Sequence, residues 1–158
     1  MFSRFKLLSA VLAGSLVFSS MFAGSASARK EDFPLPERSV GSVSIFSNSG
    51  GSIGLFALRA AKLRESRAPV RFTGRCDSAC TLLLSLPSSQ TCVSEGAVFR
   101  FHAPKHPSAK AARYAKDYMM RKYPRWVQAW IGRNRGLSNR LITMDYKYAS
   151  RYLRTCVG

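Results

Sequence analysis

The sequence predicts an α/β protein with a parallel β-core, flanking helices and a helical C-terminal third. From residue 40 onward, short β-branched and aromatic runs alternate with longer runs of helical pattern. This order is typical of a parallel α/β core. From Ser108 onward, small and apolar residues recur at helical spacing, which predicts the helical C-terminal third.

The expected elements follow the chain in order. We expect strands at 43–47, 70–73, 91–93 and 97–102, and helices at 53–65, 78–86 and 109–122. Pro124 breaks or restarts the last helix ahead of Trp126. Residues 29–39, which include two prolines, are expected to form an extended lead-in. A single domain is therefore expected at residues 40–158.

Residues 1–28 have the pattern of a secretory signal peptide. Two basic residues are followed by the apolar stretch Leu7–Phe22 and then by the small residues Ala26-Ser27-Ala28. Serine and glycine interrupt the apolar stretch, which falls short of the ~20 apolar residues of a spanning helix. We expect cleavage after Ala28 and export, with a periplasmic or secreted location; an uncleaved anchor is the alternative.

The charge of the chain is its unusual compositional feature. There are 25 Lys and Arg residues against 8 Asp and Glu, a net charge of +17, and more than half of the basic residues follow His102. An exported protein of this charge is expected to meet anionic envelope components and not nucleic acid. The alternative is that the charge only keeps the domain soluble. Whether the protein is an oligomer stays open.

All four cysteines follow the expected cleavage site, at positions 76, 80, 92 and 156. An even number in an exported chain predicts two disulfides, with three connectivities open. We favour Cys80–Cys92 and Cys76–Cys156, because this pairing would brace both sides of the turn at Ser78. Zinc is the alternative, but the sequence has only 2 histidines and no second paired cluster. We therefore expect neither a metal nor another cofactor.

Ser78 stands where the strand at 70–73 is expected to turn into the helix at 78–86. The surrounding residues are Gly74-Arg75-Cys76-Asp77-Ser78-Ala79-Cys80-Thr81. A serine at a helix start lies beside unpaired backbone N–H groups and the positive end of the helix dipole, which suits acyl transfer. The alternative is that Asp77 or Ser78 only caps the helix.

Two further segments could complete a site with Ser78. Upstream, Asn48-Ser49-Gly50-Gly51 joins an expected strand to an expected helix. A Gly-Gly turn allows positive φ and can direct an N–H group at a developing oxyanion, although by itself it is usually an ordinary turn. Downstream, Phe101-His102-Ala103-Pro104 places an imidazole 24 residues after Ser78.

In this order, the three motifs resemble those of the Clp protease proteolytic-subunit family, within the ClpP/crotonase fold. They are most similar to its small secreted relatives with a Ser-Ala-Cys signature, and the resemblance spans roughly residues 43–104. It implies a serine hydrolase or peptidase acting on peptide or small acyl substrates. By this resemblance Ser78 is the nucleophile, His102 is the base, and the N–H groups of Gly51 and Ala79 form the oxyanion hole. The proline that the family usually has between Ser49 and Gly50 is missing.

The family's third catalytic residue is an aspartate downstream of the histidine, and only two aspartates follow His102. Asp117 falls in the basic helical segment 109–122 and is expected to be a solvated surface residue. Asp145 lies at about the expected distance and is the candidate acid; its alternative role is to cap the segment 146–153. The rival function is a catalytically inactive envelope protein that binds anionic partners through its basic helices.

Overall fold

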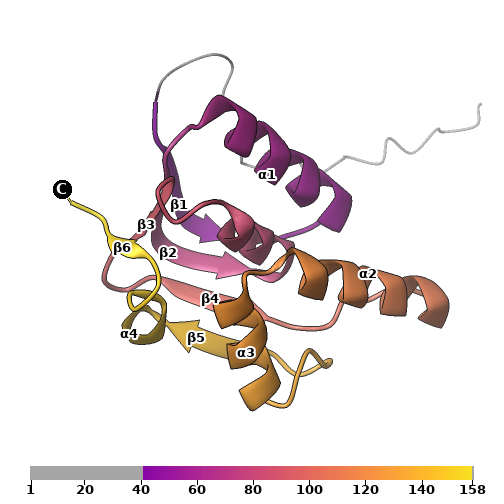
Figure 1. Cartoon of the computed structure of the whole chain (residues 1–158). Coiled ribbons are helices and arrows are strands. Elements are labelled where there is room, and N and C mark those ends of the chain that lie inside the picture. The colour runs from indigo at the N-terminus through magenta and orange to yellow at the C-terminus, as the bar shows by residue number, and fades with distance from the viewer. Residues whose placement is uncertain (1–40, 158) are drawn as a thin grey trace, which may run out of the picture. The chain divides into compact units, whose positions relative to one another are not determined.

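The computed structural model describes residues 41–157 (Figure 1). The expected signal peptide at 1–28 and the lead-in at 29–39 lie outside the described residues. The strands are β1 (Val43–Asn48), β2 (Val70–Asp77), β3 (Thr91–Val93), β4 (Val98–Phe101), β5 (Ile142–Asp145) and β6 (Arg154–Thr155). The helices are α1 (Ile53–Ser66), the 3₁₀ helix η1 (Ser78–Ser85), α2 (Ala109–Lys122), α3 (Arg125–Arg133) and α4 (Tyr146–Ala149).

The six described strands form one mixed sheet with β2 at its centre. On one side β2 pairs with β1; on the other it pairs with β3 along its first half and with β4 along its second. These pairs and β3–β6 are parallel, whereas β4–β5 is antiparallel. The mixed α/β class agrees with the prediction. The C-terminal third, however, is not purely helical, because it supplies β5 and β6.

One face of the sheet is buried against the helices. Phe72 and Phe99 pack edge to face with ring centroids 5.0 Å apart, and Phe101 contacts Trp130 of α3 at 5.6 Å. Each such fully buried side chain stabilises the fold by roughly 1.5–3 kcal/mol. The alternate residues of β2 and β4, among them Arg71 and Arg100, are only partly buried. This alternation orients the strands whose ends carry the site.

A bulge in β1 explains why β2 is longer than expected. The register between β1 and β2 shifts between Ile45 and Ser47, and Phe46 is left exposed. A Cβ at residue 74 would overlap the Phe46 carbonyl group, so only glycine fits beside the bulge. Gly74 therefore lies inside β2, and the strand continues to Asp77, directly before Ser78.

The favoured disulfide pairing was wrong. The structure pairs Cys76 with Cys80 and Cys92 with Cys156, with Cα–Cα distances of 5.4 and 4.9 Å. The turn from β2 into η1 is tight enough to bring Cys76 and Cys80 together. Cys156 follows β6, which pairs with β3 and so places this cysteine beside Cys92 and away from β2.

The described helices include none long and apolar enough to cross a membrane.

Candidate functional site

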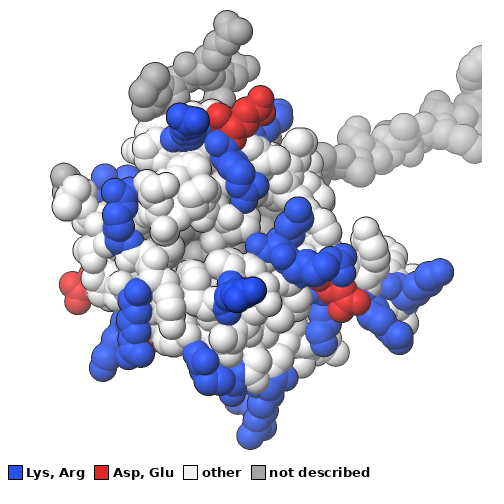
Figure 2. Space-filling view, viewed as in Figure 1, with Lys and Arg blue, Asp and Glu red and all other residues white. Residues whose placement is uncertain are grey.

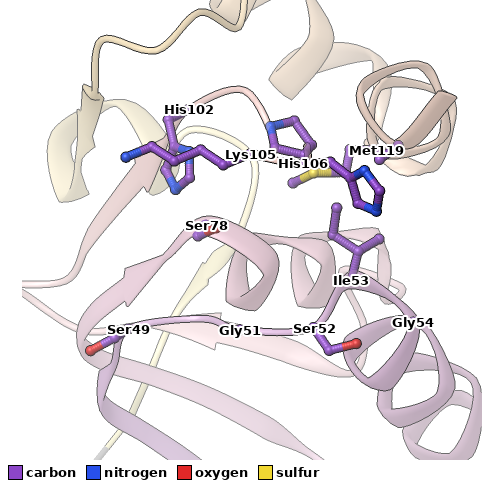
Figure 3. Close-up of a pocket in the computed structure, with 12 residues that line it drawn as sticks. Ser49, Gly51, Ser52, Ile53, Gly54, Ser78, His102, Lys105, His106 and Met119 are labelled. Atoms are coloured by element: carbon purple, nitrogen blue, oxygen red, sulfur yellow. The ribbon is translucent and has the colours of Figure 1, made fainter. Parts of the chain in front are cut away.

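A cavity of about 580 Å³ lies where β1, β2 and β4 end (Figure 3). The segments that follow these strands contribute Ser49 and Gly51, Ser78, and His102. The carboxyl ends of parallel strands meet at one edge of a sheet, where α/β proteins commonly bind ligands. Segments far apart in the sequence therefore contribute to one cavity, as the sequence predicts.

Ser78 follows β2 with a left-handed backbone, at φ +53°. A left-handed backbone is energetically unfavourable for any residue that has a side chain. The surrounding structure must therefore hold Ser78 in this conformation. Asp77 makes no side-chain capping bond, and no hydrogen bond of the Ser78 hydroxyl is found in residues 41–157. The structure thus gives no support to a purely capping role for either residue. In Figure 3, Ser78 lies between the Gly51 loop and His102.

Three contacts hold the Ser78 turn. The Cys76–Cys80 disulfide encloses it, with both cysteines fully buried. Gly50 packs directly on it, since a Cβ at residue 50 would lie 2.7 Å from Ser78 Cβ and 2.9 Å from Ala79 N. The Thr81 hydroxyl donates to the Ser78 carbonyl oxygen at 2.6 Å and accepts a hydrogen bond from the Tyr123 hydroxyl at 2.6 Å.

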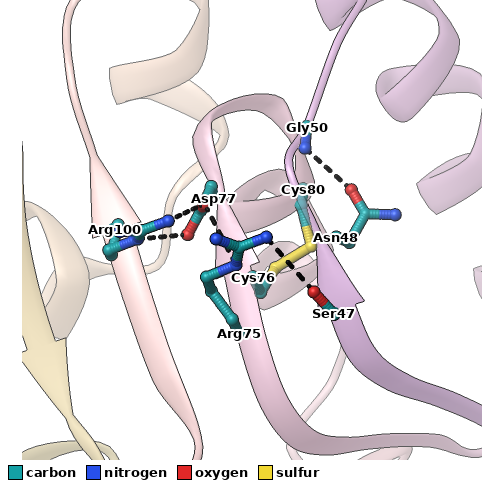
Figure 4. A network of polar contacts seen from close by, with 8 residues as sticks. All are labelled: Ser47, Asn48, Gly50, Arg75, Cys76, Asp77, Cys80 and Arg100. Carbon is teal, nitrogen blue, oxygen red and sulfur yellow. Dashed lines mark hydrogen bonds and ion pairs between the residues drawn. A yellow bond between two sulfur atoms is a disulfide. The ribbon is translucent and has the colours of Figure 1, made fainter.

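The ends of β2 and β4 are joined by an ion pair between Asp77 and Arg100 (Figure 4). Both guanidinium donors reach the carboxylate, Nε at 2.7 Å from Oδ1 and a second nitrogen on Oδ2. Hydrogen bonding to Asp77 raises the pKa of Arg100. Asp77 precedes Ser78, and Arg100 stands two residues before His102, so the pair fixes the strand ends that carry both. This pair was not predicted from the sequence, in which one acidic residue in a basic strand was its only signal.

His102 is oriented by a backbone carbonyl group. Its Nδ1 lies 2.7 Å from the Ala103 carbonyl oxygen, which can only accept a hydrogen bond, so in the neutral imidazole Nδ1 carries the proton and Nε2 has the free lone pair. Ala103 is itself fixed, because its N–H donates to the Ser138 carbonyl at 2.7 Å. Across the described residues, no hydrogen bond links His102 to Ser78.

Asp145 does not reach this histidine. It is paired with Val98 at the beginning of β4, whereas His102 follows the end of that strand. Four residues of strand separate the two positions, about 13 Å. Asp145 instead accepts a hydrogen bond from the Tyr148 N–H at 2.9 Å and caps α4, which is the alternative role that the sequence left open. Asp117 is exposed on α2, as expected.

Of the two N–H groups expected to form the oxyanion hole, only that of Gly51 belongs to a residue that lines the cavity. The Gly50 N–H is already bonded to Asn48 Oδ1 at 2.8 Å, but the Gly51 N–H has no hydrogen bond within the described part of the chain. Gly51 lines the cavity at φ +145°. Ala79 is fully buried and is not among the residues that line the cavity; it lies in the first turn of η1, where backbone N–H groups lack helical partners.

The remaining cavity wall is partly apolar and partly basic. Ile53 and Met119 form apolar wall, and Lys105 and His106 are its basic residues (Figure 3). No acidic residue lines the cavity. Nowhere in residues 41–157 do three or more metal-ligating side chains gather.

No family model and no curated protein matches the sequence. Among solved structures, the chain is similar to a ClpP1 mutant from Listeria monocytogenes, with 14% sequence identity and a TM-score of 0.49. The match covers 72% of this chain and 71% of that one. A likeness this distant supports no conclusion on family or activity.

Proposed function

We propose that this protein is an exported, ClpP-like serine hydrolase that acts on peptide or small acyl substrates. The observation that carries the proposal is the shared cavity of Ser78, His102 and Gly51, in which the serine has a left-handed backbone at a strand end. A serine on a strained strand-to-helix turn presents its hydroxyl group at the edge of the sheet, as the nucleophile of α/β-hydrolases does.

The proposed reaction is acyl transfer. The Ser78 hydroxyl attacks the substrate carbonyl while His102 Nε2 takes its proton, and the imidazolium returns this proton to the leaving group. The N–H groups of Gly51 and Ala79 would hold the oxyanion, and each such donor is worth about 2.7–4 kcal/mol of barrier. Rotation of the Ser78 side chain, with His102 kept on the Ala103 carbonyl, must first bring the hydroxyl group within hydrogen-bond range of Nε2.

The site would work as a dyad. The Ala103 carbonyl fixes the histidine tautomer, which is one task of the aspartate in a triad. A neutral carbonyl stabilises an imidazolium less than a carboxylate does. We therefore expect slower turnover than a complete triad would give.

The test is labelling of the oxidised protein by a fluorophosphonate probe, which reacts with activated serines. We expect wild type to be labelled, Ser78→Ala to lose the label and His102→Gln to slow labelling by about 10²-fold or more. Ser85→Ala, at the other end of η1, is the matched control and should be labelled like wild type. An unlabelled wild type, or a label that survives Ser78→Ala, would refute the proposal.

The substitution Asp145→Ala tests whether the site works as a dyad or as a triad. Loss of the α4 cap should lower the free energy of unfolding by about 1 kcal/mol, measured by urea denaturation. The rate of probe labelling should stay at the wild-type value, because Asp145 lies at the other end of β4 from His102. A large fall in labelling rate in a folded variant would show that Asp145 takes part in the site.

Export is part of the proposal. It is supported by the signal-like pattern of residues 1–28 and by two disulfides, which persist in oxidising compartments. The mass of the protein recovered from the producing cell tests it, with a chain that begins at Arg29 expected. A full-length chain in the cytoplasm would contradict it.

A non-catalytic binding protein is the second candidate. It is favoured by the missing Ser78–His102 hydrogen bond and by basic side chains that outnumber acidic ones on the face in Figure 2. Such a protein would be folded but unlabelled by the probe. Its affinity for anionic polymers would fall steeply with salt.

A further inference from the structure

A second cavity, of about 650 Å³, lies at the segment between α3 and β5. Three arginines line it: Arg133, Arg135 and Arg140. Ser138 and Thr143 add two hydroxyl groups. Basic residues are spread over the face shown in Figure 2, but at this cavity three of them border one hollow. We call this set of five residues the arginine loop.

No carboxylate of the described residues neutralises the arginine loop. No acidic residue lines its cavity, and in residues 41–157 none of the three arginines has a carboxylate partner, since the ion pairs there involve Asp77. Arg133 donates to the Tyr148 hydroxyl at 2.5 Å, which fixes its position without neutralising it. Three uncompensated guanidinium groups repel one another, and an anion between them would relieve this repulsion.

The backbone that carries these donors is held in place. Arg135 and Gly136 both have a left-handed backbone, at φ +68° and +73°, and the Gly136 N–H donates to the Ile131 carbonyl at 2.9 Å. Leu137 is buried, with 4% exposed. The Ser138 carbonyl accepts from the Ala103 N–H. Arg135 and Ser138 are therefore presented by a loop segment of defined course, whereas Arg133 lies at the end of α3 and Thr143 in β5.

We propose that the arginine loop binds a phosphate group. Guanidinium groups donate in planar pairs that match phosphate oxygens, and hydroxyl groups supply further donors. A phosphate group has four oxygen atoms, two or three of them unesterified, against two in a carboxylate, so it offers more acceptors to a set of three arginines and two hydroxyl groups. The phosphate could belong to a phospholipid headgroup or to a free phosphate ester; the chemistry of recognition is the same.

The test compares two pairs of substitutions that remove the same charge. Arg135→Gln with Arg140→Gln changes the arginine loop; Arg113→Gln with Arg121→Gln, on α2, is the control, and all four side chains are exposed. Binding of glycerol phosphate is measured by titration calorimetry. Binding to phosphatidylcholine vesicles with and without phosphatidylglycerol is measured by sedimentation. Thermal unfolding checks that each variant is folded.

We expect the loop variant to bind at least about tenfold more weakly than the control variant in one or both assays. Loss in the vesicle assay alone identifies a lipid headgroup, and loss with glycerol phosphate alone identifies a soluble ester. Equal weakening in both variants, no binding by wild type, or equally tight binding of polyglutamate would overturn the proposal. Probe labelling of Ser78 is independent of all these outcomes.

Discussion

The two disulfides of this protein differ in what they constrain. Cys76–Cys80 spans 4 residues, is fully buried and closes a small ring around Ser78. Cys92–Cys156 spans 64 residues and ties the end of the chain to β3 beside β6. The first disulfide constrains the turn that carries the candidate nucleophile. The second links two segments that lie far apart in the sequence and so constrains most of the chain between them.

From this difference we expect one disulfide to contribute mainly to the stability of the fold and the other mainly to the geometry of the site. In the chain-entropy account, a disulfide stabilises by restricting the unfolded chain, and the effect grows with the length of the loop that it closes. The long loop corresponds to about 4 kcal/mol and the short one to about 2 kcal/mol. The short disulfide should therefore matter less for stability and more for the conformation of Ser78.

Removal of the long disulfide should have the largest effect on stability. Cys92→Ala with Cys156→Ala should lower the free energy of unfolding by about 4 kcal/mol, measured by urea denaturation. Well below the unfolding transition, Ser78 should still react with the probe at the wild-type rate, because neither cysteine lines the cavity. A lower labelling rate in the folded variant would show that the Cys92–Cys156 disulfide also influences the conformation of Ser78.

Gly50→Ala should disturb the turn from its other side. The added Cβ would lie 2.5 Å from the Asp77 carbonyl oxygen, at a residue with φ +80°. Overpacking and backbone strain together should cost about 3 kcal/mol, and the displaced turn should lower the labelling rate. Gly96→Ala is the control: its φ is +85°, but nothing lies within 4 Å of its added Cβ. It should cost only about 1 kcal/mol and leave labelling unchanged; equal effects of both substitutions would contradict this.

Removal of the short disulfide should show the opposite pattern to removal of the long one. Cys76→Ala with Cys80→Ala should cost about 2 kcal/mol, but should slow probe labelling, because the left-handed Ser78 backbone loses the ring that encloses it. The comparison is made well below the unfolding transition of both double variants. Unchanged labelling here would mean that Gly50 and Thr81 alone hold the turn.

The sequence predicted the order of the elements from β1 to α2, because hydrophobic periodicity sets it, but it missed the strands β5 and β6 of the C-terminal third. The expected strands at 70–73 and 97–102 correspond to β2 and β4. The end of β2 was missed, because Gly74 serves a bulge in the neighbouring strand and not a turn. The disulfide pairing was missed because it depends on β6 joining β3, and a strand of two residues has no periodicity to detect.

The sequence predicted which segments meet at the cavity, but not which groups contact one another there. Motif order alone placed Ser78, His102 and Gly51 together, and the cavity agrees. The partner of His102 is a backbone carbonyl, which every residue has and no sequence pattern marks. The separation of Asp145 from His102 follows from the antiparallel pairing of β4 and β5, an arrangement that the parallel core did not suggest.

The smallest predicted effect concerns the third contact at the Ser78 turn, from Tyr123. This side chain is 2% exposed, and burial raises the pKa of its hydroxyl above the ordinary value of 10.0, although the hydrogen bond with Thr81 acts in the opposite direction. Below pH ~10 the hydroxyl is neutral in both states. Above it the unfolded chain ionises first, so stability is lost as the pH rises.

Tyr123→Phe tests this contact. At neutral pH, loss of the hydrogen bond to Thr81 should cost about 1 kcal/mol. At about pH 11, wild type should lose about 1.4 kcal/mol through the ionisation of this tyrosine in the unfolded chain, so the two proteins should become nearly equal in stability. Tyr114→Phe is the control, since that ring is 68% exposed, and its difference from wild type should stay constant with pH. Urea denaturation across this pH range decides: a Tyr123→Phe deficit that does not shrink would show that the hydroxyl group ionises in the folded protein as readily as in the unfolded chain.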